Sequence, residues 1–332
     1  MHATLDCLTA MAACTLFAAG AFGQSPEASF FTEPSAIADE LWHLKWSRQV
    51  GMVVLTEPGR SEKSGESNKP VFRRRRVYER AIGDGIRTGD HRMNELLELA
   101  VSAHGGLERW KRIRSIDVSL IISGQLLEVK GFPEHQQTKV TIDADRPRTV
   151  MEPYGEEGAR GIYTPSRVWI ESRDDGREIV ELKEPRASFA GHVRDTRWDQ
   201  LQRLYFLGYA MWNYLATPFI LVRDGFDIQE LALHDEDGER WRVLQVRYPK
   251  DIPTHCDTQQ FYFNSDGILK RIDYTTDVLG GVASHYLYDP KNFAGLIVPT
   301  RRRVVQRTPA GPKITGITAV FLDYLDVQIH DR

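Results

Sequence analysis

Three adjacent residues, His255-Cys256-Asp257, are of the types that supply bases, nucleophiles and metal ligands. Neighbouring residues of an extended segment point to opposite sides, so the triplet cannot by itself form a hydrogen-bonded pair or chelate one ion. The sequence contains no Gly-x-Ser-x-Gly, no phosphate-binding loop, no His-Glu-x-x-His and no Cys-x-x-Cys. We therefore expect the triplet in a loop or at a strand end. We predict no catalytic residue, no metal site and no cofactor.

Two further sets of charged residues lie in segments that read as strands. Arg301 and Arg303 share one face of such a strand, and Arg302 takes the other. Arg301 and Arg303 are candidates for contact with an anionic head group. Alternatively, the arginines belong to a solvated edge strand and discourage sheet-to-sheet association. Asp323 and Asp326 are three residues apart, on opposite faces of their strand, which argues against a carboxylate pair for acid–base chemistry.

The elements that position these residues are mainly antiparallel strands. An aromatic strand and an alternating strand span residues 260–274, joined by the Asn-Ser-Asp-Gly turn at 264–267. Asp-Gly supplies the positive φ that a tight hairpin needs. A strand at 283–288 follows, then a predicted break at Asp289-Pro290, and then a strand at 296–305. This stretch predicts a sheet with one solvated and one buried face.

Alternation of apolar and polar residues predicts the other strands. Residues 116, 118, 120 and 122 are all apolar and define one firmly apolar face. The remaining expected strands are 139–142, 148–151, 162–171, 179–182, 228–233, 241–248 and 314–329. About eleven strands separated by Gly, Pro and Asp turns indicate an all-antiparallel meander. No repeat of fixed period is evident, which argues against a propeller.

Two short helices are expected before the first strand. Residues 94–103 carry apolar residues at helical spacing, and Gly105-Gly106 ends the helix. His104 is expected to contact carbonyls at that helix end. Residues 107–113 form a second helix of two turns, which directs Trp110 inward.

One segment, between residues 195 and 218, breaks the β pattern with a longer helix. Apolar residues recur every three or four positions on two faces, so the helix must be covered on more than one side. It is expected to lie within or across the curved sheet and to end at Pro218. It is either a buried core helix or a lid over an apolar cavity that accepts acyl chains. The candidate ligand-binding residues are Trp198, Leu201, Leu204, Tyr205, Gly208, Met211, Trp212 and Leu215.

The first 92 residues differ from the rest. Residues 7–22 form an apolar run followed by small residues, which predicts a cleaved signal peptide over residues 1–23, although no Lys or Arg precedes the run. Residues 24–92 read as an extension and linker, partly disordered, with a basic run at 73–76 that is either an anionic-surface patch or a solvated segment. We expect a periplasmic or otherwise exported protein with one thiol, Cys256. A true start at Met93 would instead make it cytoplasmic.

The order of these elements resembles the outer-membrane lipoprotein carrier and sorting superfamily. The resemblance rests on Ala103-His104-Gly105-Gly106-Leu107, the apolar helix, the hairpin at 262–274 and the late strand at 295–300. It covers residues 93–332. It implies an antiparallel sheet of eleven strands curled into an unclosed barrel, with helices over its apolar interior. It also implies a non-enzymatic activity, the sheltering of acyl chains in transit.

Composition limits the alternatives. With 41% hydrophobic and 27% charged residues, the chain is an ordinary globular protein, and its net charge of −3 argues against a nucleic-acid binder. We expect a monomer with a β-rich (α+β) domain that binds a hydrophobic or acylated ligand, with an envelope protein as a further partner. Two other classes stay open. One is an interaction module without a small ligand; the other is an enzyme for an apolar substrate that uses His255 or His285.

Overall fold

The computed structural model of this protein describes residues 93–307 and 313–332, and all statements below concern those residues. The predicted signal peptide, linker and basic run lie outside them. The predicted domain from Met93 onward is the part that the structure describes. Its helical elements are α2 (Glu95–Ala103), α3 (Leu107–Lys111), α4 (Gln125–Val129), η1 (Pro185–Phe189), α5 (Gln200–Ala216) and η2 (Phe219–Val222). None of these helices is long and apolar enough to cross a membrane.

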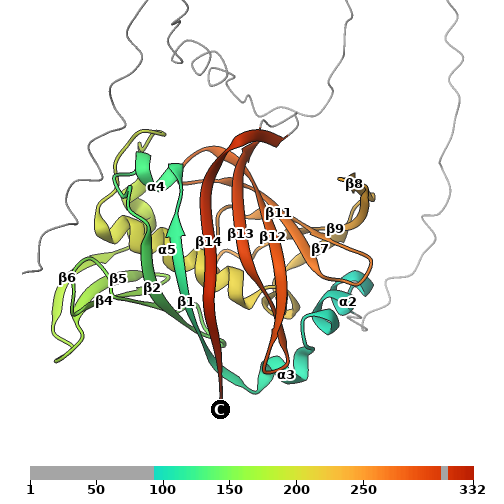
Figure 1. Cartoon of the computed structure of the whole chain (residues 1–332), viewed down its shortest axis with the longest axis horizontal. Coiled ribbons are helices and arrows are strands. Elements are labelled where there is room, and N and C mark those ends of the chain that lie inside the picture. Colours follow the sequence, from blue (N-terminus) through green and yellow to red (C-terminus); the bar gives the residue numbers. More distant parts are fainter. Residues whose placement is uncertain (1–92, 308–312) are drawn as a thin grey trace, which may run out of the picture. The chain divides into compact units, whose positions relative to one another are not determined.

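Fourteen antiparallel strands are found among the described residues (Figure 1). They are β1 (Ile113–Ser123), β2 (Gln136–Asp143), β3 (Thr149–Glu152), β4 (Ala159–Thr164), β5 (Arg167–Ser172), β6 (Glu178–Lys183), β7 (Asp227–Glu230), β8 (His234–Glu236), β9 (Glu239–Arg247), β10 (Thr258–Phe263), β11 (Leu269–Thr276), β12 (Gly281–Phe293), β13 (Leu296–Arg307) and β14 (Lys313–Asp331). Their order is β6-β5-β4-β3-β2-β1-β14-β13-β12-β11-β10-β9-β7, and β8 pairs with β9.

The sheet is open, since β6 and β7 stand at its two ends and do not pair with each other. The predicted unclosed antiparallel sheet is therefore confirmed. The strand count exceeds eleven for two reasons. The expected strand 162–171 is two strands, because Pro165 and Ser166 turn the chain between β4 and β5. The Asp237-Gly238 turn, with φ of 52° and 81°, folds the short β8 back onto β9.

The predicted break at Asp289-Pro290 is wrong, because β12 continues through it. Pro290 faces Pro299 of β13, and proline has no backbone N–H group. At this position neither strand therefore has a donor that needs an acceptor on the neighbouring strand. Next to the two prolines, the Thr300 hydroxyl donates to the Asp289 carbonyl at 2.9 Å and so links β13 to β12. Two prolines that each argue against a strand are thus accommodated as a facing pair.

The helices before β1 follow the sequence prediction closely. The Asn94 side chain caps α2 by accepting from the amides of Leu96 and Leu97. His104 follows the helix and hydrogen-bonds the Ala100 carbonyl through Nδ1 at 2.8 Å, as expected. Trp110 of α3 is buried, and its ring stacks on that of Phe219 at a centroid distance of 4.6 Å.

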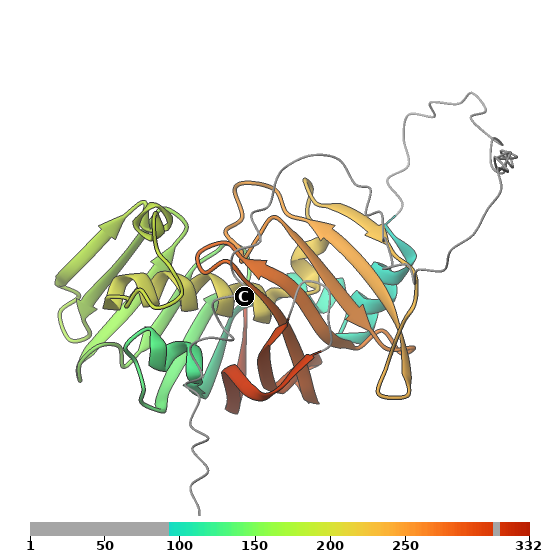
Figure 2. The ribbon, with the colours of Figure 1, turned by 90° about the horizontal axis from the view of Figure 1, so that it is seen from above.

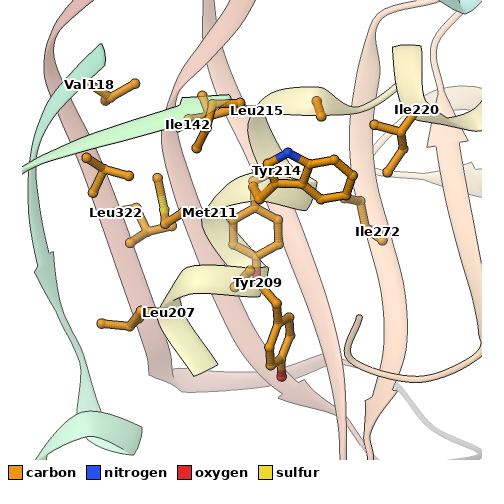
Figure 3. Close-up of a cluster of buried hydrophobic side chains, with 14 of the residues drawn as sticks. Val118, Ile142, Leu207, Tyr209, Met211, Tyr214, Leu215, Ile220, Ile272 and Leu322 are labelled. Carbon is orange, nitrogen blue, oxygen red and sulfur yellow. The ribbon is translucent and has the colours of Figure 1, made fainter. Parts of the chain in front are cut away.

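Helix α5 runs across the strands on one face of the sheet, called here the inner face (Figures 1 and 2). It contacts β2, β3, β4 and β5 along one part of the sheet. Figure 3 shows its apolar side chains among those of β1, β2, β11 and β14, including Val118, Ile142, Ile272 and Leu322. The alternating face predicted for β1 is completely buried here. The core of the protein therefore consists of the inner face and α5 together.

Two glycines let α5 approach the sheet closely. A Cβ built on Gly161 of β4 would lie 2.8 Å from Leu204 Cδ1, and one built on Gly208 of α5 would lie 2.4 Å from Tyr163 Cβ. Contacts this short exclude any side chain larger than hydrogen. The Thr149 hydroxyl also donates to the Gly208 carbonyl at 2.8 Å. Helix and sheet are therefore fitted to each other at backbone distance.

Replacing Gly208 by Ala tests this close packing. Alanine favours a helix by about 1 kcal/mol over glycine, but overpacking a tight core costs roughly 1–3 kcal/mol. We expect Gly208→Ala to lower the free energy of unfolding in urea. Gly281→Ala serves as the control, because a Cβ there meets nothing within 4 Å. An unchanged or raised stability of Gly208→Ala would contradict the packing described.

Candidate ligand-binding site

The predicted helix is present with well-defined ends. Asp199 caps α5 by accepting from the Gln202 amide, while the Gln202 side chain accepts from the Asp199 amide, which completes a capping box. The helix ends at Ala216, just before Thr217-Pro218, as predicted. Every residue from Leu201 to Ala216 is buried. The prediction that α5 needs cover on more than one side is therefore confirmed.

Seven of the eight residues predicted to bind ligand lie in this buried segment, and Trp198 lies just before it. Of all eight, seven have side chains with 8% exposure or less, and Gly208 is the close-contact glycine described above. The seven are Trp198, Leu201, Leu204, Tyr205, Met211, Trp212 and Leu215. Trp198 precedes the helix and packs against Phe206 of α5 at 5.0 Å. Trp212 Nε1 donates to the Asp143 carbonyl at 2.9 Å, which pins the ring to the end of β2.

The segment before α5 is held by a lysine that sequence reasoning missed. Lys130 is completely buried, and its ammonium donates to the carbonyls of Val193, Arg194 and Thr196. Burial lowers the pKa of Lys130, and the nearby Asp195 carboxylate partly offsets this effect. Three carbonyl acceptors match the three donors of an ammonium group. Lys130 therefore fixes the start of the α5 segment.

A polar cluster lies inside the apolar core. His255 is buried, and its Nδ1 and Nε2 hydrogen-bond the hydroxyls of Tyr209 and Tyr214 at 3.1 and 2.8 Å. The Tyr214 hydroxyl also hydrogen-bonds that of Tyr274, whose ring stacks on His255 at 4.1 Å. Burial lowers the pKa of His255 to about 3 and raises that of Tyr214 to about 12. All four groups are therefore neutral at pH 7.

The sequence held a signal for this cluster. Tyrosine hydroxyls on a helix that is apolar all round need buried partners. Tyr209 and Tyr214 are such residues, and both hydroxyls bond to His255. The predicted loop placement of the triplet at 255–257 is confirmed, since it precedes β10. Burial raises the pKa of Cys256 to about 11, so its thiol stays protonated and is a poor nucleophile.

Close to this cluster lie buried polar groups with unused hydrogen-bonding atoms. His285 of β12 is fully buried, and neither ring nitrogen has a hydrogen-bond partner among the described residues. Its ring meets the Tyr214 ring edge-on at 4.4 Å. Burial lowers the pKa of His285 well below its usual value, and the charge of Arg302 adds to this shift. His285 is therefore a neutral imidazole at pH 7.

Arg301, Arg302 and Arg303 alternate in exposure as predicted, with Arg302 on the inner face. The alternative of an edge strand is wrong, because β13 lies between β12 and β14. Arg301 forms an ion pair with Asp289 at 3.1 Å, and Arg303 forms one with Asp323 at 2.7 Å. The two predicted head-group contacts thus lie on the outer side of the sheet, away from α5. A head-group role for Arg301 and Arg303 stays a prediction.

The prediction that Asp323 and Asp326 face opposite sides is wrong. A bulge at Leu325 shifts the register between β1 and β14, so Asp326 pairs with Ser119 while Tyr324 pairs with Leu120. Both carboxylates consequently lie on the solvent side. They do not form a pair there, since Asp323 binds Arg303 and Asp326 accepts from Gln328. Among the described residues, no group of three or more His, Cys, Asp or Glu is arranged to hold a metal ion.

Comparisons with known proteins give matches at the level of structure. No protein-family model and no curated protein matches the sequence. The chain is similar to the crystal structure of a LolA superfamily protein from Nitrosomonas europaea, with 14% identity, a TM-score of 0.39, and coverage of 70% of this chain and 94% of that one. It is also similar to a DUF1329 family protein from Desulfovibrio piger, with 12% identity, a TM-score of 0.38, and coverage of 70% and 91%.

A third similar structure is an outer-membrane lipoprotein-sorting protein domain from Vibrio parahaemolyticus. Its identity is 8% and its TM-score 0.42, with coverage of 71% of this chain and 91% of that one. The open sheet and the helix across it, described above from the strand order itself, are the fold that the superfamily resemblance noted in the sequence implies.

The buried neutral histidine makes stability depend on pH. Above about pH 6.5, His285 is neutral in both the unfolded and the folded protein. Below that pH, His285 takes up a proton only in the unfolded protein, so the free energy of unfolding falls. Between pH 7.5 and 5, His285 accordingly accounts for a loss of about 2 kcal/mol. In His285→Leu this contribution is absent. We therefore expect the loss of unfolding free energy between pH 7.5 and pH 5 to be about 2 kcal/mol smaller than in the native chain.

His135→Gln is the matched control, because His135 is exposed. Urea unfolding monitored by tryptophan fluorescence at both pH values measures the effect. An unaltered pH dependence in His285→Leu would mean that His285 gains a proton in the folded state.

Proposed function

We propose that this protein binds and carries a hydrophobic or acylated ligand, with the inner face of the sheet as the binding surface. The observation that carries the proposal is the position of α5, an apolar helix buried on all sides against an open sheet. A sheet that does not close needs a separate element to cover its apolar face. Here one helix supplies much of that cover. A ligand of similar apolarity can take its place.

The energetics of such an exchange are favourable to a carrier. Each buried methylene contributes about 0.8 kcal/mol, whether it belongs to a leucine or to an acyl chain. An acyl chain on the inner face therefore covers apolar side chains of the sheet that a displaced helix would expose, and it offsets part of the burial that the helix loses. Non-directional burial also tolerates acyl chains of different length.

The covering helix has the composition of an adaptable surface. Met211 lies beside Leu322 and Leu215 beside Ile142 in Figure 3, and the helix also carries the aromatic residues Tyr205, Phe206, Tyr209, Trp212 and Tyr214. Flexible and aromatic side chains repack around ligands of different shape. The proposal includes transit through an aqueous compartment outside the cytoplasm, in keeping with the apolar run at residues 7–22.

A reversible cross-link between α5 and the sheet tests the proposal. The Cβ positions at 163 and 208 lie 2.4 Å apart, and a disulfide spans ~3.5–4.5 Å, so Tyr163→Cys with Gly208→Cys joins them after a small separation. Cys7, Cys14 and Cys256 are replaced by Ala to prevent other pairings. We expect the oxidised protein to lose at least tenfold in affinity for a fluorescent C16 fatty acid. Dithiothreitol should restore the affinity.

The single variants Tyr163→Cys and Gly208→Cys, treated with the same oxidant, serve as controls. Circular dichroism verifies that the cross-linked protein stays folded. Full uptake by the cross-linked, folded protein would show that α5 need not move, and the proposed exchange would be wrong.

A further inference from the structure

Two arginines of this chain are buried to the same degree on opposite faces of the sheet. Arg271 and Arg302 are each 1% exposed. Arg271, on the outer face, forms ion pairs with Glu236 and Asp273 and lies 3.8 Å above the Tyr262 ring. Arg302, on the inner face, has no carboxylate within ion-pair distance among the described residues. A buried charge without a counter-charge is costly, so the contrast between the two requires an explanation.

Part of the explanation is helix capping. Arg302 Nη2 donates to the Tyr214 carbonyl at 3.0 Å. The residue four positions after Tyr214 is Pro218, which has no amide hydrogen to offer that carbonyl. The negative end of the helix dipole offsets some of the arginine charge. Capping nevertheless uses one of five donors. Among the described residues Arg302 Nε and Nη1 have no well-aligned acceptor, and the neutral Tyr324 hydroxyl is the polar group beside the guanidinium.

The side chains around Arg302 supply no negative charge. The strand register places Arg302 and Val304 on the inner face of β13, with His285 of β12 directly opposite Val304. His285 has both ring nitrogens unused. The Arg302 guanidinium lies over the rings of Tyr214 and Tyr324, at 5.2 and 5.6 Å from their centroids. Cation–π contacts ease the burial of a guanidinium but leave its in-plane N–H donors free.

His104 extends the same group of donors. It is 2% exposed, its Nδ1 is bound to the Ala100 carbonyl, and its Nε2 has no partner. Burial lowers its pKa, and the charge of Arg302 contributes to the shift. His285 and Arg302 lie on the covered side of the sheet, and His104 is near enough to feel the charge of Arg302. The chemistry that such a group lacks is an anionic oxygen acceptor.

We infer that Arg302, together with His285, binds the anionic head group of an acyl ligand, a carboxylate or a phosphate. This inference rests on the proposed function and specifies its ligand. When the acyl chain displaces α5, the anionic oxygens replace the Tyr214 carbonyl as acceptors for Arg302. Two oxygens match the fork of a guanidinium, and charge-assisted hydrogen bonds are stronger in a region without water. The ligand brings the counter-charge that residues 93–307 and 313–332 do not provide.

The experiment compares four ligands of equal chain length by isothermal titration calorimetry at pH 8. Palmitate and 1-palmitoyl lysophosphatidate carry the anionic head group, whereas hexadecanol and methyl palmitate do not. We expect an anionic ligand to bind the native chain at least tenfold more tightly than hexadecanol. Whether palmitate or lysophosphatidate shows the preference distinguishes a carboxylate from a phosphate ligand.

Arg302→Met is the decisive variant. We expect it to abolish the preference while retaining hexadecanol binding, and to melt at the same or a higher temperature, because an unpaired buried charge is removed. Arg240→Met is the control, since Arg240 is exposed on β9 and paired with Asp235. It should keep the full preference.

Equal affinity of the native chain for anionic and neutral ligands would overturn the inference and leave the proposed function standing. Absence of binding for all four ligands would overturn both. The comparison of ligands on the native chain decides the matter even where Arg302→Met fails to fold. An unchanged preference in a folded Arg302→Met would equally overturn the role of Arg302, with capping of α5 as its remaining function.

Discussion

Burial of α5 against the inner face is the interaction on which the rest of the structure depends. The sheet has free ends at β6 and β7, so its own strands cannot enclose its apolar side chains. A helix that is mostly apolar on all its sides, with Gln202, Arg203 and Asn213 as buried polar exceptions, has the complementary requirement, because it is stable only where all its faces are covered. Glycines at 161 and 208 bring the two to backbone distance. Each component is therefore incomplete without the other.

In the function that we propose, the polar groups on this face would give the exchange of helix for ligand its chemical specificity. His255 is saturated by two tyrosine hydroxyls from α5, whereas His285 and Arg302 keep unused nitrogens. Arg302 connects the two states that we propose. In the empty protein it caps α5 through the Tyr214 carbonyl, and in the loaded protein it binds the ligand head group. The same side chain would thus contact helix and ligand in turn.

Local patterns in the sequence predicted much of this architecture, and long-range pairing explains what they missed. The spacing of Trp198 through Leu215 identified α5, because a helix covered on all sides carries apolar residues on two faces. The bulge at Leu325 and the facing prolines 290 and 299 depend on the register of neighbouring strands, which no single strand encodes. The isolation of Arg302 from carboxylates follows from the same register. Sequence alone gave its face of the strand but not its neighbours.

Hydrogen exchange of α5, measured by mass spectrometry with and without saturating palmitate, shows whether the helix leaves the inner face when a ligand binds. We expect amides of Gln200–Ala216 to exchange faster in the loaded protein, because the ligand takes the place of the helix on the inner face. Amides of β1 and β14, which stay paired, should keep their protection. Bound palmitate with unchanged or increased protection throughout α5 would contradict the account, since the helix and the ligand would then occupy separate places.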